Sequence, residues 1–269
     1  MTLRKVLREW QEQPQEVAEL SELAKSLGIT RIVLPGQALD TDRPTLTYGG
    51  ADLTKSVGAQ GPAASWASAP TDLSGIKLAD NPVAGAVHSG IALVRIGALP
   101  GDSATILCNS DYQSAVTCWQ FRIGSSGQIQ ICKPGVAVIV NGSTAGAVGE
   151  WVVLGWSEDT ADHRVYRAGV LDGSDTTSYS YSTSAQASIG ACYGNSVYDW
   201  RGQIAALAIA PGRLWNAAEH GLWRNPADLW ATLFAPRATW VPVSSGGAAS
   251  PVAANATYYQ MIAQQRIGY

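Results

Sequence analysis

The chain has 269 residues, of which 46% are hydrophobic and only 14% are charged. That length and apolar content are enough for one large domain, or two small ones, with a real core. Low charge combined with 28 glycines is typical of a β protein rich in turns. Nucleic-acid binding needs clustered Lys and Arg, but the 18 basic residues are scattered and the net charge is −3, so we expect no nucleic-acid partner.

The N-terminal stretch and the cysteines limit where the protein works and what it binds. The first residues, MTLRKVLREWQE, carry charges throughout and lack the apolar segment of a signal peptide. The chain has no run of apolar residues long enough for a membrane span, so we expect assembly in a cytoplasm. The 4 cysteines form no CxxC motif, which argues against a zinc or redox motif. Cys118 and Cys132 flank a predicted hairpin that brings them close together, and we favour reduced core thiols over a disulfide.

Residues 1–28 have the pattern of a helix. Apolar side chains occupy a and d positions of consecutive heptads: Leu3, Val6, Trp10, Val17, Leu20, Ala24 and Leu27. Pro14 interrupts this pattern, so two helices of about three turns each are as compatible with it as one. The apolar stripe either packs on its own domain or associates with copies of itself, and its strict heptad period favours the second. We therefore predict a homo-oligomer, with a trimer as the first candidate, docked through Leu3, Val6, Trp10, Val17, Leu20 and Leu27.

The rest of the chain divides into three parts. Residues 29–50 contain two prolines among mixed polar residues and are predicted to be a linker. Residues 51–234 repeat short β-branched and aromatic segments between turn residues, which predicts a mainly β fold built as a large antiparallel β-sandwich. Residues 235–269 begin as a Gly/Ser/Ala/Pro linker and end in TYYQMIAQQRIGY, which we interpret as a docking peptide. Its docking side chains are Tyr258, Tyr259, Met261, Ile262 and Tyr269.

The sandwich ends in the stretch RGQIAALAIAPGRLWNAAEHGLWRNPADLW, residues 201–230. Its first half alternates like a strand, and its second half has helical spacing, with Leu214, Leu222 and Trp223 as packing residues. Asn225-Pro226 is interpreted as the stop of this one short helix.

Candidate catalytic residues are few. A sandwich glycosidase needs two carboxyl groups, but Glu158, Asp159 and Asp162 lack the E-x-D-x-x-E order and suit a solvated turn. A serine hydrolase is disfavoured because the chain has no G-x-S-x-G motif. His220 is expected to form a surface pair with Glu219.

Calcium is the one metal for which ligands can be named. Oxygen ligands could come from one acidic segment and neighbouring loops: Asp172, Ser174, Asp175 and Thr176, with Asn141 or Asn195. The D-G pair in this segment is also a strong hairpin signal. A turn is therefore the favoured interpretation, and no cofactor is expected.

The chain has 10 tryptophans and only 2 phenylalanines. Flat aromatic side chains suit both sugar-binding sites and subunit interfaces. Trp119, Trp151 and Trp156 alternate with apolar residues and are predicted to lie in the core. The candidates for a sugar-binding rim bunch in one loop before a strand: Tyr193, Asn195, Tyr198, Asp199 and Trp200. The alternative is that these side chains only cover the end of the sandwich.

With these strands laid out, the region from residue 51 to residue 230 resembles the concanavalin A-like lectin/glucanase superfamily of jelly rolls, especially its laminin G-like branch. The likeness is carried by GEWVVLGW, HRVYRAGVLDG, YDWRGQIAALAIAPGRL and LWNAAEHGLWRNPADLW. Residues 219–247, EHGLWRNPADLWATLFAPRATWVPVSSGG, are similar to the C-terminal end of lectin-like proteins encoded in tailed-phage and prophage genomes.

The resemblance implies a non-enzymatic structural protein of a phage virion. Its lectin-like sandwich would be displayed on the head or tail, beside other virion proteins, and could bind host-surface glycans. One alternative is a polysaccharide-cleaving enzyme of the glucanase type. Another is a stand-alone sugar-binding module.

Overall fold

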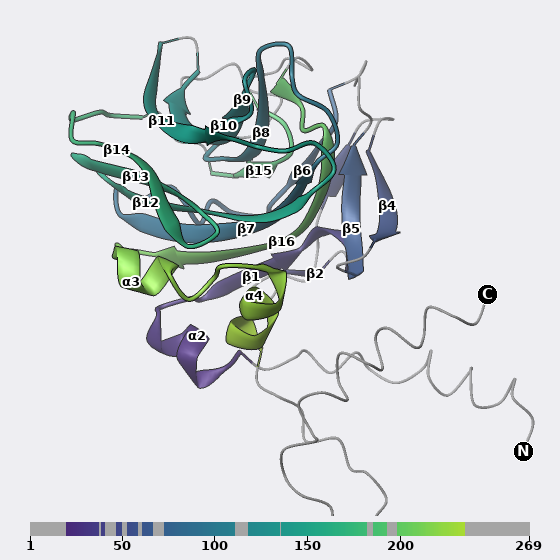
Figure 1. Ribbon diagram of the computed structural model, residues 1–269, viewed down its shortest axis with the longest axis horizontal. Helices are drawn as coiled ribbons and strands as arrows, with labels where there is room; N and C mark the ends of the chain where they lie inside the picture. The colour runs from purple at the N-terminus through teal and green to yellow at the C-terminus, as the bar shows by residue number, and fades with distance from the viewer. Residues whose placement is uncertain are drawn as a thin grey trace, which may run out of the picture.

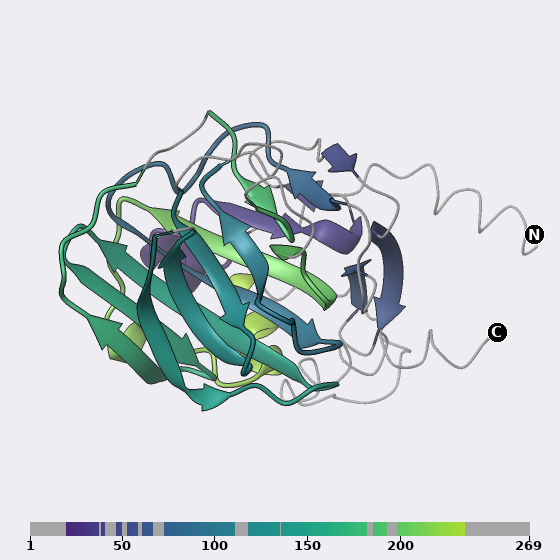
Figure 2. The same cartoon turned by 90° about the horizontal axis from the view of Figure 1, so that it is seen from above.

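The computed structural model describes residues 20–37, 39–40, 47–49, 53–58, 61–66, 73–110, 118–134, 136–181, 185–192 and 198–234. Within these ranges the protein is mainly β, and two antiparallel sheets pack face to face as a sandwich (Figure 1 and Figure 2). This architecture confirms the expected fold class. The predicted docking residues of the two chain ends, apart from Leu20 and Leu27, lie outside the described residues.

The larger sheet has nine strands. Its main path runs through β14 (Val170–Asp175), β13 (Asp162–Arg167), β12 (Trp151–Asp159), β7 (His88–Ile96), β16 (Gly202–Pro211), β1 (Arg31–Leu34) and β2 (Leu39–Asp40). A side branch adds β5 (Gly61–Trp66), which pairs with β16, and β4 (Leu53–Gly58), which pairs with β5.

The smaller sheet has seven strands and lies over the larger one (Figure 2). Its order is β11 (Ala137–Ala145), β10 (Gln128–Lys133), β9 (Gln120–Gly124), β8 (Ser103–Cys108), β15 (Ser188–Ile189), β6 (Gly75–Lys77) and β3 (Thr47–Gly49). The first four of these strands form a meander of consecutive hairpins, which brings residues close in sequence into register.

Short helices form a third layer on the outer face of the larger sheet (Figure 1). They are α2 (Glu22–Ser26), α3 (Ala217–His220) and α4 (Pro226–Leu233), and a 3-10 turn, η1 (Pro35–Gln37), follows β1. No helix within the described ranges has the length and hydrophobicity to span a membrane.

The sequence of β16 shows why the molecule has two cores. Its larger side chains, Ile204, Leu207 and Ile209, face the smaller sheet and join the core between the sheets. Its alanines face the helices and join a second core with Trp215 and Trp223. Small residues on this side let the two indoles pack close against the strand. The alternation QIAALAIA therefore specifies two buried faces rather than one buried and one solvated face.

The predicted linker of residues 29–50 contains a strand of the sheet instead. All four residues of β1 are buried, and Arg31, Ile32 and Val33 pair with residues 207–209 of β16. Composition suggested a linker because of the two prolines, but RIVL, which precedes both of them, has strong β propensity and an edge of β16 to pair with.

The C-terminal helical stretch is two helices, not one. Asn225 begins α4 rather than ending a helix, because its Oδ1 accepts a hydrogen bond from the Asp228 amide at 3.0 Å and Pro226 occupies the first turn. Trp223 is fully buried, as predicted, whereas Leu214 is only half-buried and Leu222 is 37% exposed. Leu222 is therefore not a packing residue.

The described end of the N-terminal apolar stripe packs on its own domain. Leu27 is 4% exposed and lies in the core beneath the helices, where its carbonyl accepts a hydrogen bond from the Trp215 indole at 2.7 Å. Leu20 packs against the same core and forms a β-bridge with Phe234. These two residues are therefore corrected from oligomer contacts to intramolecular ones. Leu3, Val6, Trp10 and Val17 lie outside the described residues.

His220 is a buried residue that joins α3 to the sheet, not part of a surface pair with Glu219. Its Nε2 lies 2.9 Å from Ser157 Oγ on β12, and its ring stacks on Tyr166 with a centroid distance of 3.7 Å. Burial lowers the pKa of His220 to about 3, so it is neutral at physiological pH. Glu219 instead completes the capping box of α3 with Asn216.

Candidate functional site

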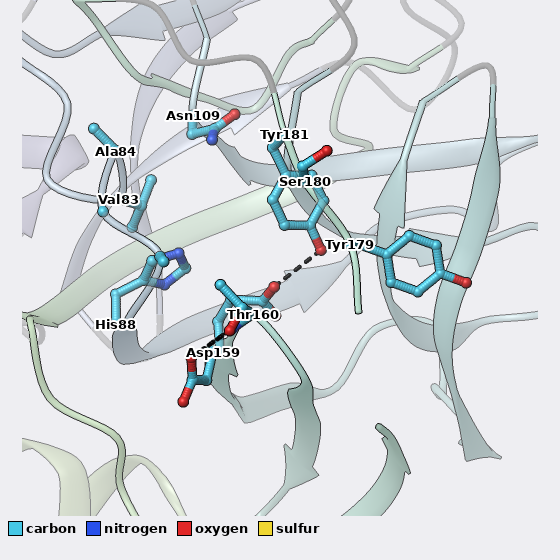
Figure 3. Close-up of a pocket in the computed structure, with 12 residues that line it drawn as sticks. Val83, Ala84, His88, Asn109, Asp159, Thr160, Tyr179, Ser180 and Tyr181 are labelled. Carbon is cyan, nitrogen blue, oxygen red and sulfur yellow. Dashed lines mark hydrogen bonds between the residues drawn. The ribbon is translucent and has the colours of Figure 1, made fainter. Parts of the chain in front are cut away.

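A pocket of about 220 Å³ opens at one end of the sandwich, where β12 ends and β7 begins (Figure 3). Its walls come from the turn before β7, the end of β12 and the segment after β14. The lining residues are Val83, Ala84, Gly85, Ala86, His88, Asn109, Glu158, Asp159, Thr160, Tyr179, Ser180 and Tyr181. Ligand sites for drug-sized molecules are usually larger, at about 300 to 1,000 Å³, so this pocket suits a small ligand or one unit of a longer one.

Glu158 is a buried acid of this pocket, only 1% exposed. The β12–β13 hairpin places it opposite His163, and its Oε1 lies 2.8 Å from His163 Nδ1. The same oxygen accepts a hydrogen bond from the Tyr181 hydroxyl at 2.9 Å (Figure 3). The other oxygen, Oε2, is buried beside the Trp119 indole, which opposes the rise that burial causes in the pKa of Glu158, although no hydrogen bond of normal geometry joins Oε2 to a described residue. The expectation of a solvated turn is therefore wrong for Glu158.

Burial raises the pKa of Glu158 above its usual range, against the opposing effect of its hydrogen bonds. Burial alone would lower the pKa of His163, but the hydrogen bond and charge of Glu158 outweigh it, so the pKa of His163 is raised. His163 Nε2 must carry a proton, because it faces the Thr177 carbonyl at 2.8 Å. One further proton is shared between Nδ1 and Oε1, so the pair as a whole is neutral whichever atom holds it.

His88 supplies a fixed hydrogen-bond donor to the pocket. Its Nδ1 lies 3.0 Å from the Trp156 indole nitrogen, which can only donate. Nδ1 is therefore the acceptor and Nε2 carries the proton. Burial lowers the pKa of His88 to about 3, and the ring packs edge-on against Trp119 with a centroid distance of 4.7 Å. His88 is thus a neutral side chain with one known tautomer.

Asn109 is oriented in the same way by the backbone. Its Oδ1 accepts a hydrogen bond from the Trp119 amide at 2.7 Å. The Nδ2 group is consequently the donor that this side chain can offer to a ligand. In Figure 3, Asn109, His88 and Tyr181 surround the pocket from different sides.

The pocket therefore combines an acceptor, two oriented donors and an aromatic ring. A second carboxyl group, Asp159, also lines it, but its Oδ1 accepts hydrogen bonds from the amide and hydroxyl of Thr160 and so caps the turn. This mixture of directional polar groups on an aromatic floor can bind a polyhydroxylated ring, whose hydroxyls both donate and accept.

Comparison with known proteins supports the fold. No family model matches the chain, and no curated protein sequence matches it. Among solved structures, domain 4 of an extracellular GH43 arabinanase from Geobacillus stearothermophilus, in complex with arabinotriose, is similar with a TM-score of 0.56 and 19% identity. The match covers 72% of this chain and 96% of that domain.

Two further structures are similar over part of their length. The receptor-binding domain of botulinum neurotoxin type G has a TM-score of 0.50 and 15% identity, with 72% of this chain and 50% of that chain covered. Trypanosoma rangeli sialidase with the inhibitor DANA has a TM-score of 0.52 and 12% identity, with 81% and 37% covered. The protein thus spans half or less of these two chains. Such low identities show a shared β-sandwich fold and leave the phage and laminin G-like resemblance as an expectation.

The expectation of a non-enzymatic protein is corrected by these comparisons. Two of the three structures come from enzymes, an arabinanase and a sialidase. A sandwich of this kind therefore gives no basis for excluding catalytic activity.

Two residues of the predicted sugar-binding rim are buried. Asp199 is fully buried, where its Oδ2 accepts a hydrogen bond from the Ser74 amide at 2.6 Å, and Trp200 is only 1% exposed. Neither can contact a ligand at the surface. Tyr198 is half-buried, while Tyr193 and Asn195 lie outside the described residues.

The candidate calcium ligands are engaged in local hydrogen bonds. Asp172 Oδ1 accepts from the Ser143 hydroxyl at 2.9 Å and from the Thr144 amide at 3.1 Å. Asp175 accepts from the Thr177 amide at 2.7 Å, and Asn141 accepts from the Gln130 side chain at 2.8 Å. These bonds explain the acidic segment by local structure. The turn interpretation is wrong, because Asp172 and Gly173 lie inside β14.

The pocket residues that the sequence did not single out are His88, Asn109 and Tyr181. The sequence did contain a signal for Glu158. Side chains alternate along a strand, so Glu158 points to the same face as Leu154 and Trp156, which are buried. No comparable signal existed for the other three residues. They come from separate strands and loops, and only the folded topology brings them together.

Proposed function

We propose that the pocket around Glu158 binds one sugar unit of a glycan. The observation that carries this proposal is the pocket wall, where the carboxyl group of Glu158 lies with the oriented donors of His88 and Asn109. Glu158 Oε1 is already bonded to His163 and Tyr181, and Oε2 is buried beside the Trp119 indole. A rotation of the carboxyl group toward the pocket would let a sugar hydroxyl donate to it.

The surrounding groups fit the rest of a sugar ring. His88 Nε2–H and Asn109 Nδ2–H₂ can donate to further hydroxyl oxygens, and Tyr181 offers an aromatic ring beside them. Two of the similar structures were solved with arabinotriose and with the inhibitor DANA, and this supports a sugar ligand by analogy of fold.

A glycan array, followed by calorimetry on the glycans that bind, tests the proposal. Glu158→Gln keeps the shape of the side chain but replaces one carboxyl oxygen with an amide group that can only donate. We expect binding to weaken about five- to a hundredfold, since leaving a buried hydrogen-bonding group unpaired costs about 1–3 kcal/mol. Glu150→Gln is the matched control, because Glu150 is exposed and precedes the opposite end of β12. Unchanged binding by Glu158→Gln would refute the proposal.

Glycan cleavage is the second candidate function, favoured by the two carboxyl groups, Glu158 and Asp159, that line one pocket. Incubation with each bound glycan, followed by a reducing-end assay, distinguishes binding from hydrolysis. Product that disappears in both Glu158→Gln and Asp159→Asn would identify a glycoside hydrolase. Binding without product would leave the sugar-binding function.

We further propose that the sandwich is displayed on a tailed-phage virion, on its head or tail, where the pocket would meet host-surface glycans. The support is the sequence similarity of residues 219–247 alone. Mass spectrometry of purified particles from the source phage or induced prophage tests it. The protein should be present in stoichiometric amounts, and its absence from intact particles would contradict a virion location.

A further inference from the structure

We propose that Cys108, Cys118 and Cys192 bind a thiophilic metal ion, with zinc as the expected occupant. Their three sulfur atoms lie within 4.8 Å of one another, and all three side chains are fully buried. This is a property of the folded chain, because the three cysteines come from the end of β8, the approach to β9 and the segment after β15. The absence of a CxxC motif therefore does not exclude a metal site.

The sulfur positions suit a shared metal. A Zn–S bond of about 2.3 Å in tetrahedral geometry places neighbouring sulfurs about 3.8 Å apart. The Cys118 and Cys192 sulfurs are 3.2 Å apart, and no pair in the cluster exceeds 4.8 Å. Sulfur–sulfur separations would have to change by up to about 1 Å to reach this value, which rotation about the cysteine side-chain bonds can supply.

Oxygen donors stand beside the cluster. The Ser188 hydroxyl and the Ser110 carbonyl each lie 3.1 Å from Cys108 Sγ. The hydroxyl can approach the fourth coordination position. The Ser110 carbonyl accepts a hydrogen bond from the Cys108 thiol, and this bond would be lost when the thiol gives up its proton to bind metal. Soft thiolate ligands select zinc or copper(I) over calcium and magnesium, which explains the choice of metal class.

A disulfide between Cys118 and Cys192 is the competing chemistry. It would use two of the sulfurs and leave the third thiol buried beside the bond without a role. A metal uses all three. Because the cluster is closed to solvent, the ion would be acquired during folding, and it would tie three chain segments together next to Asn109 of the pocket.

The test is metal content of the full chain, produced in zinc-supplemented medium and passed through gel filtration. We expect about one zinc ion per chain, and intense sulfur-to-metal charge-transfer absorption when cobalt(II) replaces zinc during refolding. Cys118→Ser and Cys192→Ser should each lose most of the zinc. Cys132→Ser is the matched control, because Cys132 is equally buried but donates to Gln120 Oε1 at 2.9 Å outside the cluster.

A second measurement covers the case in which a variant fails to fold. Thiol titration of the native wild-type protein should detect no reactive thiol. Titration with a chelator and denaturant should then detect four thiols, the three of the cluster and the buried Cys132, together with the released zinc. Wild-type protein without zinc would overturn the proposal. So would a peptide linking Cys118 to Cys192 in a non-reduced digest.

Discussion

At the scale of single residues, the three histidines divide into two kinds. His88 and His220 are buried without a carboxylate partner, and burial lowers the pKa of each to about 3. His163 is equally buried but faces Glu158, whose charge and hydrogen bond raise its pKa. The same desolvation therefore gives two neutral structural rings and one ring that shares a proton with an acid.

The two structural histidines predict an acid-sensitive fold. Unfolding returns each ring to a pKa of about 6.5, so below that pH the unfolded chain binds protons that the folded chain does not. Stability is fully present above pH 6.5 and is lost as the pH falls towards 3. Each histidine contributes a slope of about 1.4 kcal/mol per pH unit inside this window.

Urea unfolding measured between pH 7 and pH 5 tests this. His220→Gln removes one of the two titrating groups, so the pH dependence should become shallower even if the variant is less stable at pH 7. An identical pH slope in the variant and the wild type would show that burial of His220 does not control the acid sensitivity.

Residue-level prediction succeeded where strand alternation was applied and failed where it was not. Trp119 and Trp156 were expected in the core and are fully buried, whereas Trp151, expected there on the same pattern, is only half-buried against the second core. Glu158 was assigned to a solvated turn because it is polar, although it lies two residues after Trp156 and therefore faces the same side of the strand. Asp199 and Trp200 were placed on a rim because they sit in a polar loop, but a loop can carry buried side chains that close the end of a sandwich.

At the scale of elements, the short helices are held by the second core rather than by their own length. α2 has only five residues, which is far below the length at which an isolated helix is stable in water. Its position depends on the apolar residues that pack beneath it. Removing one of these apolar side chains therefore tests whether the end of the N-terminal apolar stripe packs on its own domain.

Leu27→Ala should lower the free energy of unfolding by about 2–5 kcal/mol, because it leaves a cavity at a site only 4% exposed. Leu23→Ala is the matched control, since Leu23 lies on the same short helix and is 44% exposed. It should change stability by about 0.5 kcal/mol or less. Equal effects of the two substitutions in a denaturant titration would contradict the packing of this segment.

Elements were predicted correctly where one sequence pattern dominated. They were predicted wrongly where the same residues are compatible with two structures. The central strands β12 and β16 were evident from periodicity. The dipeptide Asn225-Pro226 is compatible with a helix stop, but it also supplies an N-cap and a first-turn proline, and here it starts α4. Likewise, the two prolines that follow β1 suggested a linker, whereas the residues just before them pair with β16 and extend the sheet.

At the scale of the whole molecule, the N-terminal segment divides in two. Residues from Leu20 onward belong to the sandwich, so only the residues before it remain available for the predicted oligomerisation. Deletion of residues 1–19 is therefore the appropriate test, because deletion to residue 28 would also remove part of the core.

Light scattering should show an oligomer for the full chain and a folded monomer after deletion of residues 1–19. Deletion of residues 251–269 is the companion variant, and it separates the contribution of the predicted C-terminal docking peptide. A full-length protein that is already a monomer, or an unchanged oligomer after both deletions, would refute self-association through the chain ends.

The central claim is that Glu158 and its neighbours form the sugar site, and a crystal structure with a glycan identified on the array tests it most directly. The claim predicts a sugar ring in the pocket, with one hydroxyl oxygen about 2.5–3.0 Å from a carboxyl oxygen of Glu158 and others within reach of His88 and Asn109. A glycan bound elsewhere on the sandwich, with this pocket unoccupied, would contradict it.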